Sequence, residues 1–235
     1  MLYLYAVIVR RPGLSIAIPG IGGAVVEIVP LRKIAVVLSP LDGGNVVATE
    51  ANLWSHERVI EKAMEETTAI PLRFGTMADE WARVRRQLSE RYRSLTARLA
   101  HLAGKVEFAV RLPSDAAEEP PVHSEASETC RGPGTAYLRS LAQTHDGWSR
   151  PIGAALKRSL ESWAVASALW PQHPSAAELR ASFLVERSKV DSFLDAAAAF
   201  RAGNPAPGLS CTGPWPPYSF ANEPLFALPE GKRHP

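Results

Sequence analysis

The residues that could do chemistry are few and widely spaced along the chain. The six histidines are scattered singly, and Cys130 and Cys211 share no CxxC spacing. Neither a zinc site nor a disulfide framework is therefore indicated. The sequence also contains no GxxxxGKS or GxxxxGKT phosphate loop, no GxSxG elbow and no HExxH helix. We expect no catalytic site, no metal and no cofactor.

One combination of residue types leaves an enzymatic alternative open. His56 and Glu57 are adjacent, and Arg73 lies in the next predicted segment. A buried arginine with a nearby carboxylate could hold a phosphate or carboxylate substrate, with the histidine as acid or base. The structural interpretation, which we favour, makes His56 a hydrogen-bonded residue at the edge of a core. Arg73 would then pair with Glu57 or cap backbone carbonyls.

The most unusual segment is the string from Thr212 to Phe220, TGPWPPYSF. It sets three aromatic side chains on a backbone that three prolines stiffen. Rigid aromatics lose little conformational entropy on binding, so the string could anchor a protein partner. Alternatively, it folds back over the last strand and closes a core, and both interpretations can hold together. The candidate residues are Gly213, Pro214, Trp215, Pro216, Pro217, Tyr218 and Phe220.

Composition is that of an ordinary globular protein. The chain is 46% hydrophobic and 21% charged, with a formal charge of +2 from 26 basic and 24 acidic residues. Such a balance predicts no nucleic-acid partner and no membrane partner. No apolar run approaches the roughly eighteen residues that a membrane-spanning helix needs, and the first residues do not have the pattern of a signal peptide. We expect the protein to stay in the cytoplasm.

Residues 81–102 predict one long helix, because apolar residues recur every three or four positions from Trp81 to Leu102. Its other faces carry six arginines. These could form a polyanion-binding stripe, which is a third hypothesis for function. Interleaved acids such as Glu90 favour an ordinary solvated face instead.

The other elements of the first half form an α+β pattern. Strands are predicted at 2–9, 25–29 and 34–39, and a short extended segment at 69–74. A helix should begin after Thr49, a good N-cap residue, and bury a stripe formed by Leu53, Ile60 and Met64.

The second half alternates in a different order. Strands are predicted at 106–112, 181–186 and 208–212, and helices at 135–144, 152–169 and 190–200. This order is close to a ferredoxin-like α+β layer with one strand replaced or lost. The predicted fold is therefore α+β with two domains, residues 1–103 and a modified ferredoxin-like domain at 104–221. A flexible loop near 113–134 and a disordered tail at 222–235 complete the prediction.

Five sequence segments, in the order in which they occur along the chain, resemble the gas vesicle protein F/L family (GvpL/GvpF) over nearly its whole length. They are YLYAVIV, NLWSHERVIEKAM, IPLRFGT, GKVEF and TGPWPPYSF. The last is the most specific. The positions carried over from the resemblance are His56, Glu57, Pro71, Arg73, Phe74, Gly75 and 213–220, with no ligand role attached.

The resemblance implies two α+β domains, the second ferredoxin-like, and no catalytic activity. It implies a minor structural component or assembly factor of gas vesicles in a prokaryotic cytoplasm. The implied partners are the major hydrophobic shell protein and other accessory proteins. The physical hypothesis is a prefolded aromatic or apolar surface that holds shell protein monomers.

Overall fold

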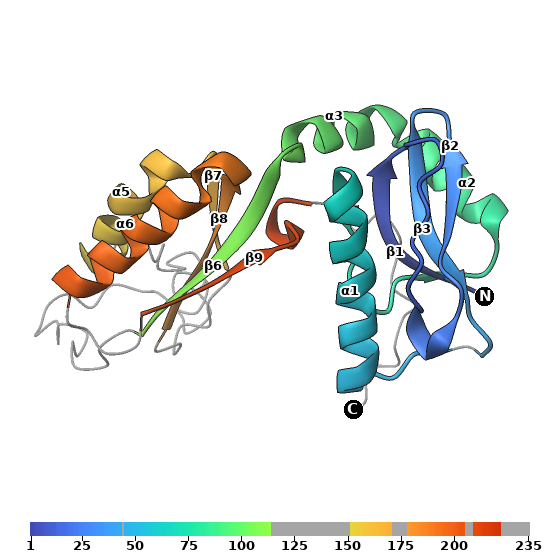
Figure 1. The fold of residues 1–235 in the computed structure, drawn as a ribbon, viewed down its shortest axis with the longest axis horizontal. Helices are drawn as coiled ribbons and strands as arrows, with labels where there is room; N and C mark the ends of the chain where they lie inside the picture. Colours follow the sequence, from blue (N-terminus) through green and yellow to red (C-terminus); the bar gives the residue numbers. More distant parts are fainter. Residues whose placement is uncertain (44, 114–150, 171–177, 205–208, 222–235) are drawn as a thin grey trace, which may run out of the picture. The chain divides into compact units, whose positions relative to one another are not determined.

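The computed structural model describes residues 1–43, 45–113, 151–170, 178–204 and 209–221. These residues separate into two compact units (Figure 1). The first unit contains residues 1–106 and also 216–221, and the second contains the described residues between 107 and 215. The sequence placed 216–221 in the second domain, whereas the structure groups them with the first unit. The reason is that Tyr218 packs against the core of the first unit.

An antiparallel sheet forms the centre of the first unit. Its strands are β1 (Leu2–Val9), β2 (Glu27–Leu31), β3 (Ile34–Pro40), β4 (Ala69–Pro71) and β5 (Met77–Ala78). The strand order is β2-β3-β1-β4, and β5 also pairs with β1. The predicted strands 2–9, 25–29 and 34–39 are confirmed, with the second displaced by two residues. β2 is an edge strand of this sheet.

The central strand β1 is apolar along its whole length because both of its faces are covered. Every residue from Tyr3 to Ile8 is completely buried. A strand buried on both faces has no solvent side that would favour polar alternation. This explains why the opening residues of the chain read as a continuous hydrophobic run.

Helix α1 (Glu50–Glu66) covers one face of this sheet. Thr49 is its N-cap, as predicted, and the Thr49 hydroxyl accepts the Asn52 N–H at 3.3 Å. The helix is buried through Val59, Ile60 and Ala63, which belong to the core cluster that includes strand β1. The predicted buried stripe is wrong at Leu53, whose side chain is 42% exposed.

The predicted helix 81–102 is two helices, α2 (Trp81–Glu90) and α3 (Tyr92–Leu102). The backbone leaves helical geometry at Arg91, with φ −103° and ψ 12°. One turn earlier, the Ser89 hydroxyl donates to the Arg85 carbonyl at 2.7 Å. Such a bond competes with the helical backbone and bends helices. Apolar spacing alone did not reveal this break, because Leu88 and Leu95 are buried on either side of it.

The second unit holds a sheet with strands β6 (Lys105–Pro113), β7 (Ala166–Leu169), β8 (Glu178–Glu186) and β9 (Ser210–Trp215). The strand order is β7-β8-β6-β9. Helices α5 (Pro151–Leu160) and α6 (Val190–Gly203) pack against each other (Figure 1). Phe193 of α6 lies 5.1 Å from the Phe108 ring of β6 and 5.5 Å from the Phe183 ring of β8, measured between centroids. These rings join helix to sheet.

The described elements of this unit run strand, helix, strand, strand, helix, strand, which is the ferredoxin-like order. The α+β class is confirmed, but the prediction that one strand was replaced or lost is wrong. Residues 166–169, predicted as the end of a helix, form strand β7, which pairs antiparallel with β8 from Ala166–Leu184 to Leu169–Ala181. The mostly small residues at 164–168 give no strong signal for helix or for strand. Pairing with β8 therefore determines that this segment is a strand.

Four short 3-10 helices complete the described elements: η1 (Ile21–Gly23), η3 (Glu161–Trp163), η4 (Arg187–Lys189) and η5 (Tyr218–Phe220). The predicted helix 135–144, the loop beyond residue 113 and the tail 222–235 lie outside the described residues. Within the described part of the chain, no helix is both long enough and apolar enough to cross a membrane.

Candidate functional site

His56 lies at the centre of a buried polar network in the first unit. Its side chain is 1% exposed. The Tyr3 hydroxyl lies 3.0 Å from Nδ1, and the Leu72 carbonyl lies 3.0 Å from Nε2. The Gly75 N–H donates to the Tyr3 hydroxyl at 3.1 Å. We call Tyr3, His56, Leu72 and Gly75 the His56 network.

These contacts define the protonation state of the imidazole. A carbonyl oxygen only accepts, so His56 Nε2 must carry the proton and donate it to Leu72. Nδ1 is then the acceptor, the Tyr3 hydroxyl donates to it, and the ring is neutral. Burial lowers the pKa of His56 to about 4, against a smaller opposing effect of the Leu72 carbonyl. Both ring nitrogens are therefore occupied by the protein itself.

Three aromatic rings enclose this histidine. The Tyr5 ring stacks on it with 5.7 Å between centroids, while Tyr3 and Phe74 meet it edge-on at 5.7 and 5.6 Å. The Tyr5 hydroxyl accepts the Ile21 N–H at 2.8 Å and lies 2.9 Å from the Ser39 hydroxyl. Our sequence analysis missed Tyr3 and Tyr5 as members of the site. Their hydroxyls within an otherwise aliphatic strand were the available signal.

Glu57 points to a different partner from the one predicted. Its Oε1 accepts the Tyr218 hydroxyl at 2.8 Å across 161 residues of sequence, and its Oε2 is buried without a hydrogen-bond partner among the described residues. Burial raises the pKa of Glu57, although the bond from Tyr218 opposes this. Burial also raises the pKa of Tyr218. The predicted Arg73–Glu57 pair is wrong: Arg73 is exposed, and no salt bridge links these two described residues.

The segment 71–75 supports the network mainly through its backbone. Pro71 is buried in β4 opposite Ala6. The Arg73 carbonyl accepts both the N–H of Thr76, at 3.1 Å, and its hydroxyl, at 2.6 Å. Gly75 has φ +81°, a backbone conformation that glycine adopts without strain. This turn directs the Gly75 N–H at Tyr3.

The string 212–220 is divided between the two units. Gly213, Pro214 and Trp215 belong to β9, and the Trp215 side chain is 39% exposed. Its Nε1 donates to the Thr212 hydroxyl at 3.2 Å. In the first unit, the Phe220 carbonyl accepts Arg98 Nη1 at 3.1 Å. Pro216, Pro217 and Phe220 are buried.

The predicted site residues thus form two groups. The structure brings His56, Glu57, Phe74, Gly75 and Tyr218 together in the first unit. It does not bring Arg73 to Glu57. For the string 212–220, the core-closing interpretation describes Tyr218, whereas Trp215 keeps an exposed ring.

The fold is one that solved gas vesicle proteins share. The crystal structure of GvpF from Anabaena sp. PCC7120 matches with a TM-score of 0.74 and 21% identity, over 94% of this chain and 96% of that one. GvpF from Microcystis aeruginosa matches with a TM-score of 0.73 and 19% identity, over 94% and 99%. At these identities, the similarity shows the fold alone.

The family model described as "Gas vesicle synthesis protein GvpL/GvpF" matches residues 1–222. The chain belongs to this family, and the resemblance seen in its sequence is confirmed. Gas vesicle protein L of Streptomyces sp. (strain CB03234) is 28% identical over 186 residues, which are 71% of this chain and 67% of that protein. Gas vesicle protein F of the same organism is 31% identical over 191 residues, 72% and 76% of the two chains. A role related to gas vesicles follows.

Proposed function

We propose that this chain is a non-enzymatic accessory protein of gas vesicle formation in a prokaryotic cytoplasm. It acts as an assembly factor or minor structural component, and it binds the major hydrophobic shell protein and other accessory proteins. Membership of the GvpL/GvpF family and the names of the relatives support this role. The two units serve as two domains of one binding protein.

The observation that carries the proposal is an apolar patch at the start of α1. Trp54 is 57% exposed, Leu53 42% and Val47 67%. Two local bonds order this part of the chain: Asn52 Nδ2 donates to the Val47 carbonyl at 2.9 Å, and Trp54 Nε1 donates to Glu50 Oε1 at 3.4 Å. Tryptophan is enriched in the energetic centres of protein interfaces. We call Val47, Leu53 and Trp54 the α1 patch.

Different residues of helix α1 serve the core and the proposed interaction surface. His56, Val59 and Ile60 are almost completely buried, whereas Leu53 and Trp54 of the first turns are exposed. Exposed apolar side chains that gather on one folded surface suit a protein interaction. The α1 patch therefore offers a prefolded surface to a hydrophobic partner such as the shell protein.

The geometry of the predicted acid–base group favours scaffolding over catalysis. The enzymatic hypothesis needs His56, Glu57 and Arg73 to act on one substrate. His56 uses both nitrogens within the network, Glu57 accepts from Tyr218, and Arg73 is exposed. These residues support a buried network that ties β1, α1 and segment 72–75 together.

Co-purification with the shell protein tests the α1 patch. The double variant Leu53→Ala, Trp54→Ala should stay folded, because both side chains are largely exposed, and should retain at least roughly tenfold less shell protein. Leu194→Ala is the matched control, since it removes a leucine of similar exposure (40%) from the second unit. Retention that falls only in the Leu194→Ala variant, or equally in both, contradicts the assignment to α1.

A further inference from the structure

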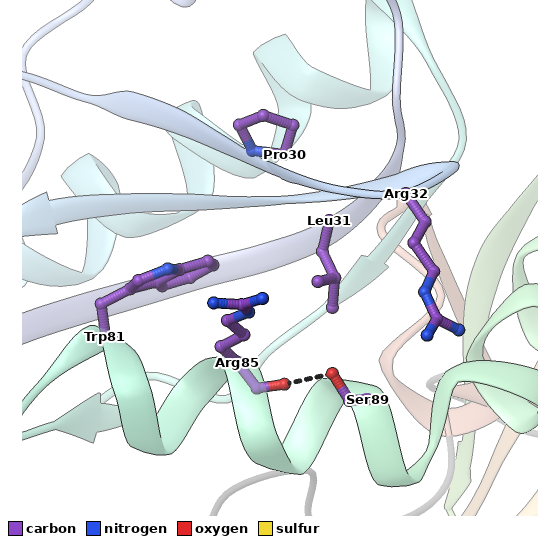
Figure 2. A pocket seen from close by; sticks show the side chains of 6 residues that line it. All are labelled: Pro30, Leu31, Arg32, Trp81, Arg85 and Ser89. Atoms are coloured by element: carbon purple, nitrogen blue, oxygen red, sulfur yellow. Dashed lines mark hydrogen bonds between the residues drawn. The ribbon is translucent and has the colours of Figure 1, made fainter.

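A polar pocket lies in the first unit, between the β2–β3 turn and helix α2. Its volume is about 420 Å³. Six residues line it: Pro30, Leu31, Arg32, Trp81, Arg85 and Ser89 (Figure 2). None of them belongs to the His56 network or to the α1 patch. Arg85 is one of the six arginines of the stripe considered from the sequence, whereas the other five residues were not considered as site residues.

One face of α2 builds the floor of this pocket. Trp81, Arg85 and Ser89 follow at intervals of four residues, so their side chains lie above one another on the helix. Figure 2 shows Trp81 and Arg85 rising from the helix toward strand β2, while the Ser89 hydroxyl bonds to the Arg85 carbonyl. Val84 and Leu88 of the same helix are completely buried. The helix is therefore anchored on one face while it presents an indole and a guanidinium on another.

Arg32 lines the pocket from the β2–β3 turn and has an unusual backbone. Its φ of +56° is the only positive φ of a non-glycine residue among the described residues. This conformation costs a side-chain-bearing residue about 1 kcal/mol relative to glycine or asparagine. Strained backbone of this kind concentrates at ligand-binding and other functional sites.

Tyr92 holds this turn in place. The Arg32 guanidinium carbon lies 5.1 Å from the centre of the Tyr92 ring, and the Tyr92 hydroxyl accepts the Lys33 N–H at 3.3 Å. The break between α2 and α3 at Arg91 places Tyr92 at the start of a new helix. The cation of Arg32 is thus positioned beside the pocket before any ligand binds.

Arg32 and Arg85 differ from Arg83 of α2 in having no ion-pair partner among the described residues. Arg83 forms an ion pair with Asp79 at 3.2 Å. Within the described part of the chain, neither Arg32 nor Arg85 has a salt-bridge partner. Two guanidinium groups therefore face one pocket without a counter-charge, in a chain whose formal net charge is only +2. The local excess of positive charge is complementary to carboxylates.

We propose that this pocket binds an acidic segment of a partner protein, with acidic side chains of that segment paired to Arg32 and to Arg85 and an apolar neighbour against Trp81. Arginine and carboxylate match in a two-point hydrogen-bonded geometry. The edge strand β2 carries Pro30, which cannot donate a backbone hydrogen bond, so strand addition at this point is disfavoured. Recognition therefore runs through side chains. The proposal extends the proposed function to a second, chemically different partner surface, and it uses no residue of the α1 patch.

Fluorescence anisotropy with defined probes tests this proposal on the full chain. The probe is a fluorescein-labelled twelve-residue peptide of alternating glutamate and leucine. Its matched control is the same peptide with glutamine in place of glutamate. We expect the acidic peptide to bind at least roughly tenfold more tightly, with an affinity that falls as salt rises.

Three variants locate the binding. Arg85→Gln and Arg32→Asn should each weaken binding roughly tenfold, because each removes one charge-assisted contact. Asparagine tolerates positive φ, so Arg32→Asn should leave the melting temperature unchanged or raised while binding is lost. Arg83→Gln is the matched control, since its charge is already paired with Asp79, and it should bind like the unsubstituted chain.

Five outcomes overturn the proposal. The first three are no binding of the acidic peptide, equal binding of the glutamine peptide, and an effect of Arg83→Gln as large as that of Arg85→Gln. The fourth is tighter binding of a twelve-nucleotide oligouridylate through the same two arginines, which assigns the pocket to nucleic acid. A concentration-dependent dimer that Arg85→Gln abolishes in sedimentation assigns the pocket to a second copy of the chain and also overturns it. Because shell protein retention depends on Leu53 and Trp54, either proposal can fail without the other.

Discussion

The buried neutral His56 makes a specific prediction about acid stability. Its pKa is lowered from 6.5 to about 4 in the folded chain, because burial penalises the imidazolium. The unfolded chain takes up the proton near pH 6.5, whereas the folded chain does not until about pH 4. Stability from this residue is therefore complete above pH 6.5 and is lost as the pH falls toward 4.

The magnitude follows from the shift itself. A difference of about 2.5 pH units at 1.36 kcal/mol per unit corresponds to about 3 kcal/mol. This is a large share of the roughly 5–15 kcal/mol that stabilises a typical domain. The loss between neutral pH and about pH 4 should therefore be easy to measure.

The perturbation that isolates this effect is His56→Gln. Glutamine keeps a neutral N–H donor that can reach the Leu72 carbonyl, and it does not titrate. Urea unfolding followed by circular dichroism gives the free energy of unfolding at several pH values from about 7.5 to 4.5. Amide exchange of β1 peptides identifies the transition that belongs to the first unit.

The unsubstituted chain should lose about 2.5 kcal/mol more than His56→Gln across this range, whatever their difference at neutral pH. His101→Gln, at an exposed histidine of α3, is the control and should follow the unsubstituted chain. Parallel pH curves for the unsubstituted chain and His56→Gln would refute the reasoning, because they would show that the buried ring takes up its proton without penalty.

Two further predictions concern the cores of the two units. Burial raises the pKa of Glu57, so its contribution to stability is complete below its unfolded pKa and falls as the pH rises; Glu57→Gln should flatten this decline in the same urea titration, and an unchanged slope would contradict the burial argument. In the second unit, Phe193→Ala removes a completely buried ring and should lower the free energy of unfolding by about 3–5 kcal/mol. Leu194→Ala, at a 40% exposed neighbour, should change it by less than about 1 kcal/mol; similar effects of the two variants would mean that Phe193 does not anchor α6.

Secondary-structure elements with a local sequence pattern could be predicted from the residues alone. The apolar run 2–9 predicted a strand because a chain covered on both faces has no polar side. Thr49 predicted the start of α1 because its hydroxyl can satisfy a free backbone N–H of the first turn. The ordered strings predicted the family, since family membership is a property of residue order along the chain.

Contacts between residues far apart in the sequence depend on how the chain packs, and the sequence pattern did not reveal them. Tyr218 donates a hydrogen bond to Glu57 across 161 residues of sequence. No local pattern could show that Tyr218, and not Arg73, would be the partner of Glu57. Strand β7 was predicted as helix because its small residues suit either state, and pairing with β8 determined the outcome. Leu53 fits the periodicity of a buried stripe but is 42% exposed, and periodicity alone does not show where along a helix the cover of the core ends.

The residues of the proposed pocket also differ in how far the sequence could reveal them. The arginines of α2 are visible in the sequence, and so is the pairing of Arg83 with Asp79, because the two residues are four positions apart. Arg32 reaches the pocket from a turn about fifty residues away in sequence, through a backbone conformation that its residue type does not favour. Side-chain types, helical periodicity and i,i+4 ion pairs are local properties, whereas the approach of Arg32 to α2 depends on how distant segments pack.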